Sequence, residues 1–460
     1  MSQRLVVVSN RVTVPRAGEP QAGGLAVALR GALETYGGLW FGWNGRVGER
    51  TGPPEKTEHA GVTYATVPLT RQEHDDYYLG YANEVLWPLC HFMLSAMDYR
   101  RSYRDCYWAV NAAFAEHLLP MIGGDDILWI HDYHLIPLAD TLRRSGVDRP
   151  MGFFLHIPFP SYSLLRALPD HRQILKDLCQ YDLLGFQTHD DLRAFRTAVV
   201  ETMAARILDD DIIEVQGHRL RASVFPVGIE VDELSDLAAR SRYSRRVERL
   251  LRSLQDRDLV IGVDRLDYSK GLPKRFQSFE RFLEQQRNRH GRLVYMQIAN
   301  PSRSEIPEYQ ELRRQLEEMA GHINGRFSDF DWMPLRYLHK SFARASLLGF
   351  YRNARAALIT PLRDGMNLVA KEYVAAQDPD DPGVPVLSEL AGAARELEAA
   401  LLVNPFDIDA TAEALERALS MPAEQRRERY HAMIEVLRRN DLTRWREEFL
   451  HQLRQGCEAG

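Results

Sequence analysis

The stretch Ile359-Thr-Pro-Leu-Arg-Asp-Gly-Met-Asn-Leu-Val-Ala-Lys-Glu-Tyr-Val-Ala-Ala376 has the pattern of an apolar strand, a polar turn and an unbroken helix. A helix that begins near Leu368 leaves free N–H groups and a partial positive charge at its first turn, which favours a phosphate there. Gly365 permits a close approach of the ligand, and Glu372 places a carboxylate suited to sugar hydroxyls about one turn into the helix. The stretch therefore predicts a nucleotide-sugar site, although an ordinary strand, turn and helix of a parallel sheet has the same pattern.

Short apolar runs separated by amphipathic stretches predict parallel α/β sheets along most of the chain. The expected strands are Leu5–Ser9, Ile127–Ile130, Gly152–His156, Leu183–Gln187, Leu259–Val263, Leu293–Ile298 and Ala357–Thr360. Parallel sheets bind ligands outside the carboxyl ends of their strands, so the residues that follow the strands are candidate ligand contacts. These residues are Arg11, His131-Asp132, His156, Arg265 and Arg303.

The chain of 460 residues is long enough for two or three domains, and its two halves begin alike. Each half opens with a strand, an arginine and a glycine turn, and residues 221–256 read as the junction. We expect two facing Rossmann-like domains with a catalytic cleft between them, an acceptor domain over residues 1–228 and a donor domain over residues 229–440. A C-terminal helix in residues 441–460, preceded by candidate cap residues, is expected to pack back on the first domain.

The composition is that of a soluble globular protein, with 45% apolar and 27% charged residues. A net charge of -6 gives no reason to expect nucleic-acid binding. The four cysteines are widely spaced and contain no C-x-x-C pair, which indicates neither a disulfide framework nor a zinc ribbon and fits a reducing cytoplasm. We expect no signal peptide and no membrane span, because no apolar run approaches ~18 residues.

Two groups of basic residues predict two anion sites. Arg265 and Lys270 lie five residues apart on the loop after a strand, where two cations suit a diphosphate leaving group, although a solvated loop with surface ion pairs has the same residues. Arg11 and Arg303 each lie among small polar residues after a strand and, with the pair Tyr77-Tyr78, form a candidate phosphate clamp. Surface solvation is the alternative for either arginine. Two phosphate sites would mean a donor and a phosphorylated acceptor.

The segment His131-Asp132-Tyr133-His134 has residue types found in metal sites, but only His156 adds a nearby ligand. We therefore favour hydrogen bonding, with Asp132 accepting from sugar hydroxyls and His156 touching the donor sugar. For His131 and His134 we expect core histidines that are satisfied by the backbone.

Tryptophans next to glycine or proline offer faces on which sugar rings stack, but tryptophan is also a large core residue. We expect Trp43 to lie in the core. The alternatives stay open for Trp40 and Trp87.

These residues also carry a resemblance that covers nearly the whole chain. The sequence resembles the trehalose-6-phosphate synthases, which are retaining glycosyltransferases of the two-Rossmann-domain GT-B fold. The motifs that carry it are Val8–Arg11, Ala22–Leu25, Leu39–Trp43, Trp129–His134, Phe154–Pro160, Arg265–Gly271 and Arg363–Glu372.

The resemblance implies transfer of glucose from UDP-glucose to glucose 6-phosphate with retention, giving trehalose 6-phosphate and UDP without a metal or other cofactor. The implied donor residues are Gly23, Gly24, Arg265, Lys270, Phe342, Asp364, Gly365, Met366, Asn367, Leu368, Val369, Ala370, Lys371 and Glu372. The implied acceptor residues are Arg11, Trp40, Tyr78, Trp87, Asp132 and Arg303. Catalysis is expected to rest on Asp364, His156, Arg265 and Lys270, through alignment and electrostatic stabilisation in a front-face mechanism.

Other functions are compatible with the same fold. A sister activity, such as a glucosylglycerol-phosphate synthase or a pseudoglycosyltransferase, would differ in the acceptor residues, and an inactive sugar-phosphate sensor would have a damaged site. The sequence leaves open the donor base, among UDP, GDP and ADP, and the oligomeric state, with a homo-oligomer among the options. Since no phosphatase domain follows residue 460, we expect a separate phosphatase to act on the product.

Overall fold

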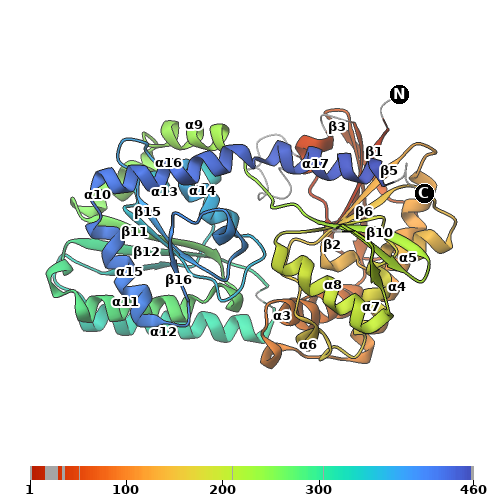
Figure 1. Cartoon of the computed structure of the whole chain (residues 1–460). Helices are drawn as coiled ribbons and strands as arrows, with labels where there is room; N and C mark the ends of the chain where they lie inside the picture. Colours follow the sequence, from red (N-terminus) through yellow and green to blue (C-terminus); the bar gives the residue numbers. More distant parts are fainter. Residues whose placement is uncertain are drawn as a thin grey trace. The chain divides into compact units, whose positions relative to one another are not determined.

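The computed structural model describes residues 3–15, 29–33, 37–50, 52–209, 211–303 and 305–456 (Figure 1). Gly23 and Gly24 lie outside these residues. The chain divides into two compact units: unit 1 comprises Met1–Pro226 and Arg444–Gly460, and unit 2 comprises Val227–Thr443. The boundary between the units falls within the predicted junction. None of the helices in the described part of the chain is long and apolar enough to span a bilayer.

Unit 2 contains a parallel sheet of six strands in the order β13-β12-β11-β14-β15-β16. The strands are β11 (Asp258–Arg265), β12 (Leu293–Asn300), β13 (Leu335–Leu338), β14 (Ala356–Ile359), β15 (Val384–Ser388) and β16 (Leu401–Val403). Along the chain the strands are added outward from β11 on one side and then outward from β14 on the other. The loops after β11 and β14 therefore flank the switch point of a doubly wound sheet, where such sheets bind ligands.

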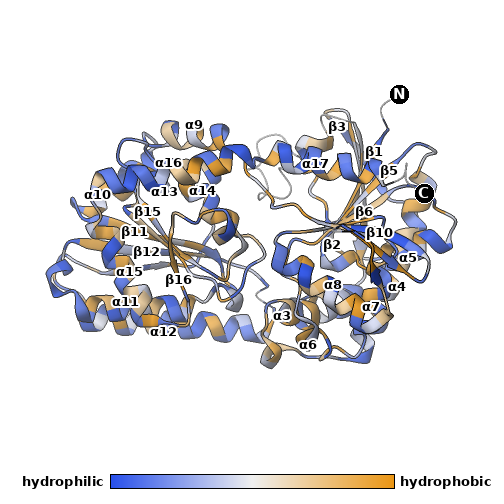
Figure 2. Ribbon diagram, in the orientation of Figure 1, coloured by the Kyte–Doolittle hydropathy of each residue, from blue (hydrophilic) through white to orange (hydrophobic). Residues whose placement is uncertain are grey.

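Helices cover both faces of the unit 2 sheet (Figure 1). They are α9 (Val231–Ser241), α10 (Arg245–Leu254), α11 (Leu272–Gln285), α12 (Pro307–Phe327), α13 (Arg344–Arg352), α14 (Leu368–Ala376), α15 (Ile408–Ser420) and α16 (Ala423–Arg439). Helices α9, α13, α14 and α16 lie on one side of the sheet, and α11 and α12 lie on the other. Figure 2 shows hydrophobic residues along the strands and hydrophilic residues on the outer faces of helices such as α12. This arrangement confirms the predicted α/β class.

Unit 1 contains a sheet of ten strands in the order β3-β4-β2-β1-β5-β6-β7-β10-β9-β8. The strands are β1 (Leu5–Arg11), β2 (Gly38–Val47), β3 (Glu55–His59), β4 (Val62–Leu69), β5 (Ile127–His131), β6 (Met151–Phe154), β7 (Leu183–Phe186), β8 (Arg206–Ile207), β9 (Ile212–Val215) and β10 (His218–Val224). The strands from β4 to β10 in this order are parallel, and antiparallel strands cover both edges. The switch point lies between β1 and β5; Arg11 is the last residue of β1 and Asp132 follows β5.

The main helices of unit 1 are α4 (Arg101–Leu118), α5 (Leu138–Arg144), α7 (His171–Leu178), α8 (His189–Met203) and the π-helix η1 (His74–Leu86). The C-terminal helix α17 (Leu442–Gln455) also packs here, because the rings of Trp445 and Phe449 lie 5.0 and 4.8 Å from the ring of Trp129. A Cβ atom at Gly152 would lie 2.7 Å from the Phe449 ring, and one at Gly185 would lie 2.8 Å from it. Two glycines of β6 and β7 thus make room for the aromatic side chain of this helix.

A buried carboxylic acid on α7 makes the stability of unit 1 depend on pH. Asp177 is fully buried and accepts hydrogen bonds from Trp108 Nε1 (2.8 Å) and Gln173 Nε2 (2.6 Å). Burial outweighs these hydrogen bonds and raises the pKa of Asp177 to about 7. Because the unfolded pKa is near 4, the native state binds the extra proton between pH 4 and pH 7, and stability falls as pH rises through that window.

We therefore predict that Asp177→Asn raises the unfolding free energy by about 1–3 kcal/mol at pH 8, since the amide carries no charge to bury. The side-chain amide of Gln173 can rotate to accept from the new N–H group. Urea denaturation at pH 8 and pH 5 measures the effect, and the gain should shrink at pH 5. An equal gain at both pH values would contradict the elevated pKa.

Candidate active site

Two loops meet at the switch point of unit 2. The turn η5 (Tyr268–Lys270) follows β11 and receives a hydrogen bond from Leu362 N to Ser269 O (2.8 Å), so it lies against the loop that follows β14. Gly271 has a φ of +67°, and a Cβ atom there would lie 2.7 Å from Thr360 O. This close approach brings Lys270 Nζ to 2.6 Å from Asp364 Oδ2. The structure thus brings together a predicted cation and a predicted carboxylate that lie 94 residues apart.

The ion pair lies at the N-terminus of α14, which begins at Leu368 as predicted. Asn367 has a φ of +79°, caps the helix by accepting from Ala370 N (3.2 Å), and donates to Asp364 Oδ2 (2.9 Å). The N–H groups of Leu368 and Val369 have no acceptor among the described residues. A cation and two free N–H groups at a helix N-terminus form a site suited to a phosphate group.

The segment 389–395 supports the loop that carries Asp364, and nothing in the sequence analysis indicated it. Asp364 N donates to Leu390 O (3.2 Å), while Gly392 N donates to Asp364 O (3.1 Å) and Ala393 N to Met366 O (2.7 Å). A Cβ atom at Gly392 would lie 1.9 Å from Gly365 O. In the sequence, only the glycine at position 392, which this close approach requires, could have indicated the contact.

A buried arginine on α11 ties the strand ends together. Arg275 is fully buried, pairs with Asp264, and donates from Nε to Thr360 Oγ1 and from Nη1 to Gln297 Oε1, both at 3.0 Å. Its Nη2 group also lies 3.3 Å from Lys270 O. Arg275 therefore connects β11, β12, the residue after β14 and the backbone of Lys270. No local pattern in the sequence indicates this role.

Arg303, predicted to bind the acceptor phosphate, is held inside unit 2. Its Nη1 group donates to Asp267 Oδ2 (3.1 Å) and Tyr309 OH (2.7 Å), and its φ is +45°. The other oxygen of Asp267 accepts from Ser269 N (3.0 Å) in the turn that carries Lys270. One buried carboxylate thus connects Arg303 to the Lys270 turn.

Other predicted donor residues differ in their exposure and contacts. Arg265 is exposed at the end of β11. Glu372 is half-buried with Oε1 3.4 Å from Arg344 Nη2, and burial raises its pKa even though Arg344 acts in the opposite direction. Phe342 packs against Phe350, with ring centroids 5.4 Å apart.

Part of the predicted donor run points into the protein. Lys371 is fully buried, donates from Nζ to Val227 O (2.7 Å), and pairs with Glu396, while burial lowers its pKa. Met366 and Ala370 are also buried. The contacts of Lys371 indicate a role in packing α14 rather than a ligand contact through its ammonium group.

In unit 1, Arg11 and Tyr78 lie around one tryptophan. The Arg11 guanidinium carbon lies 5.9 Å from the ring centroid of Trp43, and the Tyr78 ring lies 5.2 Å from the same tryptophan. Tyr77 instead points into the core, where its hydroxyl donates to Asn10 Oδ1 (2.8 Å). The π-helix η1 separates the two tyrosines in this way, and π-helices often occur at functional sites.

The three tryptophans considered as sugar-stacking residues, Trp40, Trp43 and Trp87, are all buried in unit 1. Trp43 is 4% exposed and donates to Arg46 O (2.7 Å), which confirms its predicted core position. Trp40 is 2% exposed and donates to Ser9 Oγ (2.9 Å), so protein covers both of its faces. Trp87 is 4% exposed and stacks on His91 with centroids 4.1 Å apart.

Asp132 follows β5 with a φ of +76°, an uncommon conformation that occurs at active sites. Its N–H donates to Phe154 O (2.8 Å), and its Oδ1 accepts from His156 N (3.3 Å). His131 is not satisfied by the backbone, contrary to our expectation: its Nδ1 lies 3.1 Å from His156 Nε2, because parallel β5 and β6 end side by side.

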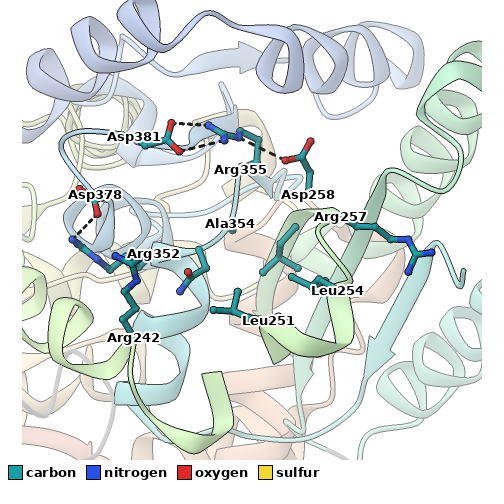
Figure 3. Close-up of a pocket in the computed structure, with 12 residues that line it drawn as sticks. Arg242, Leu251, Leu254, Arg257, Asp258, Arg352, Ala354, Arg355, Asp378 and Asp381 are labelled. Carbon is teal, nitrogen blue, oxygen red and sulfur yellow. Dashed lines mark hydrogen bonds and ion pairs between the residues drawn. The ribbon is translucent and has the colours of Figure 1, made fainter. Parts of the chain in front are cut away.

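A cavity of roughly 270 Å³ in unit 2 lies at the opposite end of the strands, beside the starts of β11 and β14 (Figure 3). Arg352 pairs there with Asp378 (3.1 Å), and Arg355 lies between Asp258 and Asp381. Arg352 and Arg355 thus already pair with acidic side chains of the cavity itself. Among the described residues no group of three or more histidine, cysteine or acidic side chains is arranged to hold a metal.

Comparison with known proteins identifies the family. The model of glycosyltransferase family 20 matches residues 3–455. The chain belongs to glycosyltransferase family 20. A trehalose-6-phosphate synthase of Enterobacter sp. (strain 638) is 49% identical over 451 residues, which cover 98% of this chain and 95% of that protein.

Solved structures of family 20 share the same fold. An α,α-trehalose-phosphate synthase (UDP-forming) from Burkholderia xenovorans in complex with glucose-6-phosphate has a TM-score of 0.94 and 46% identity, covering 98% of this chain and all of that one. A trehalose-6-phosphate structure from E. coli with UDP-2-fluoro glucose bound has a TM-score of 0.95 and 46% identity, covering 98% and 99% of the two chains. The fold of this family 20 protein is therefore GT-B, as predicted.

Proposed function

We propose that the chain is an α,α-trehalose-phosphate synthase (UDP-forming), which transfers glucose from UDP-glucose to glucose 6-phosphate with retention. The observation that carries the proposal is the meeting of Lys270, Asp364 and the free N–H groups of α14 at the switch point of unit 2. The proposal is also supported by the similar proteins, which are named trehalose-6-phosphate synthases and match 98% of this chain.

In this proposal, unit 2 binds the donor. Arg265 and Lys270 neutralise the diphosphate, while the N–H groups of Leu368 and Val369 hold it at the helix N-terminus. Glu372 accepts from the ribose hydroxyls. Asp364 and His156 are assigned to the donor glucose by the resemblance, as are Gly23 and Gly24, which lie outside the described residues, to the phosphate.

The acceptor phosphate is bound by Arg11, Tyr78 and Arg303, and the acceptor ring by Asp132 and Trp87. The position of Arg11 beside Trp43 and Tyr78 supports this assignment. We leave Trp40 out of the acceptor site, because its Nε1 group donates a hydrogen bond to Ser9 Oγ in the core.

The reaction is proposed to occur on one face of the donor sugar. The bond between C1 and the phosphate oxygen breaks, the bond from C1 to the acceptor oxygen forms, and the departing phosphate oxygen takes the proton of the incoming hydroxyl. Lys270, Arg265 and the α14 N-terminus stabilise the charge that develops on the leaving diphosphate. The protein thus contributes alignment and electrostatic stabilisation, without a covalent intermediate.

The proposal includes the setting of the reaction. Among the described residues Cys90, Cys106 and Cys179 form no disulfide, which supports a reducing compartment such as the cytoplasm. A separate phosphatase is proposed to act on trehalose 6-phosphate. The proposal allows the enzyme to assemble as a homo-oligomer.

The decisive test is synthesis by the purified chain. Glucose 6-phosphate is incubated with UDP-, GDP- or ADP-glucose, with and without a chelator, and released nucleotide and product are followed by NMR. We expect α,α-linked trehalose 6-phosphate from UDP-glucose, at a rate that the chelator does not change. Absence of product with every donor would reject the function, and loss of activity with chelator would reject the metal-free mechanism.

The donor cation is tested by Lys270→Met. We predict that kcat falls about 10²–10³-fold, because one charge that stabilises the leaving diphosphate is lost. Lys274→Met, on the helix that follows the same turn, is the matched control and should retain the activity of the unsubstituted enzyme. Similar activity for the two variants would remove Lys270 from the mechanism.

The acceptor assignment of Arg303 is tested by Arg303→Lys, which keeps a positive charge beside Asp267. Alanine is less suitable, because it leaves a buried carboxylate without its partner. We predict a roughly tenfold rise in KM for glucose 6-phosphate and little change for UDP-glucose, since lysine lacks the bidentate fork. The control is Arg313→Lys on the exposed face of α12, and equal changes in both KM values would contradict the assignment.

A further inference from the structure

A buried histidine and a half-buried histidine in unit 1 meet edge to edge. His131 closes β5, His156 follows β6, and the distance from His131 Nδ1 to His156 Nε2 is 3.1 Å. The two ring planes are 29° apart, with centroids separated by 5.4 Å. At this distance one nitrogen carries the proton and the other accepts it, so each ring restricts the tautomer of its neighbour.

The surroundings keep both rings neutral. Burial lowers the pKa of His131, with a further contribution from His156, and burial lowers the pKa of His156 to about 3. The ring neighbours are apolar: Trp129 lies 4.6 Å from His131, Phe154 lies 4.6 Å from His156, and Trp445 lies 6.3 Å from His156. A neutral pair contains one donor and one acceptor at its shared edge.

The far side of His131 decides between the two tautomer combinations. Its Nε2 is buried and has no hydrogen-bond partner among the described residues. If His131 accepted at Nδ1, its proton would lie on Nε2 and leave a buried N–H group unsatisfied, which is rarer in proteins than an unsatisfied acceptor. This comparison favours the combination in which His131 carries its proton on Nδ1 and donates it to His156 Nε2. His156 must then carry its own proton on Nδ1.

We propose that His131 is a positioning residue that holds His156 in its Nδ1–H tautomer, so that His156 offers a neutral N–H donor to an oxygen of the donor glucose. This inference rests on the proposed function, in which His156 touches that sugar. The backbone of His156 is fixed separately, by its hydrogen bond to Asp132. His131 thus sets the chemical character of the His156 ring, while Asp132 fixes the chain that carries it.

The test compares His131→Leu, which removes the partner, with His131→Asn, whose amide nitrogen lies near the position of Nδ1. Imidazole ¹⁵N NMR on histidine-labelled protein reports the tautomer of His156, and His156→Gln assigns the signal. We expect a protonated Nδ1 in the unsubstituted protein and a mixture of tautomers in His131→Leu. The kcat with UDP-glucose should fall roughly tenfold in His131→Leu, the worth of about one hydrogen bond, and recover largely in His131→Asn.

Binding of glucose 6-phosphate separates a positioning role from a structural one. If His131 only positions His156, the Kd of glucose 6-phosphate, measured by calorimetry, should stay within twofold in both variants. If the substitutions instead distort the structure around Asp132, binding of glucose 6-phosphate should weaken. His117→Leu on α4 is the matched control and should leave the tautomer and kcat unchanged. A protonated Nε2 on His156 in the unsubstituted protein, or an unchanged tautomer and kcat in His131→Leu, would overturn the inference. Absence of any synthesis by the unsubstituted enzyme would instead reject the proposed function.

Discussion

The candidate site of unit 2 depends on one buried guanidinium. Arg275 bonds to side chains in or directly after three neighbouring strands, and its pairing with Asp264 compensates the charge of both groups in the interior. A buried arginine without this partner would be strongly destabilising, so the strand ends are held in one arrangement. This arrangement also positions the turn that carries Lys270, because Arg275 bonds to Lys270 O. The turn in turn places the Lys270 ammonium group beside Asp364.

The same topological rule positions the candidate residues in both units. In each sheet the strand order reverses between two neighbouring parallel strands, and the loops after those strands separate and leave room for a ligand. In unit 1, Arg11 ends one such strand and Asp132 follows the other, and in unit 2, Lys270 and Asp364 lie on such loops. The backbone of these loops is not paired with a strand. Helix caps, residues with positive φ angles and side-chain hydrogen bonds fix its conformation instead.

Local patterns in the sequence predicted much of this structure. All seven predicted strands are present, α14 begins at Leu368, and the C-terminal helix spans Leu442–Gln455 as expected. The strand Gly38–Val47 was not predicted, because its glycines and tryptophans resemble a loop with aromatic faces more than an alternating strand. Arg275 and the support from residues 389–395 were also missed, since their partners are distant in the chain and no local period reveals them.

The pairing of Lys270 with Asp364 and of Arg303 with Asp267 has a consequence for selectivity among anions. Each cation already has a carboxylate beside it, so an incoming anion must compete with a tethered counter-ion that is present at a high effective concentration. A monovalent ion such as chloride gains little by that exchange. A phosphate dianion brings more charge and several acceptor oxygens, so a protein with this arrangement distinguishes phosphorylated sugars from the salt that surrounds them.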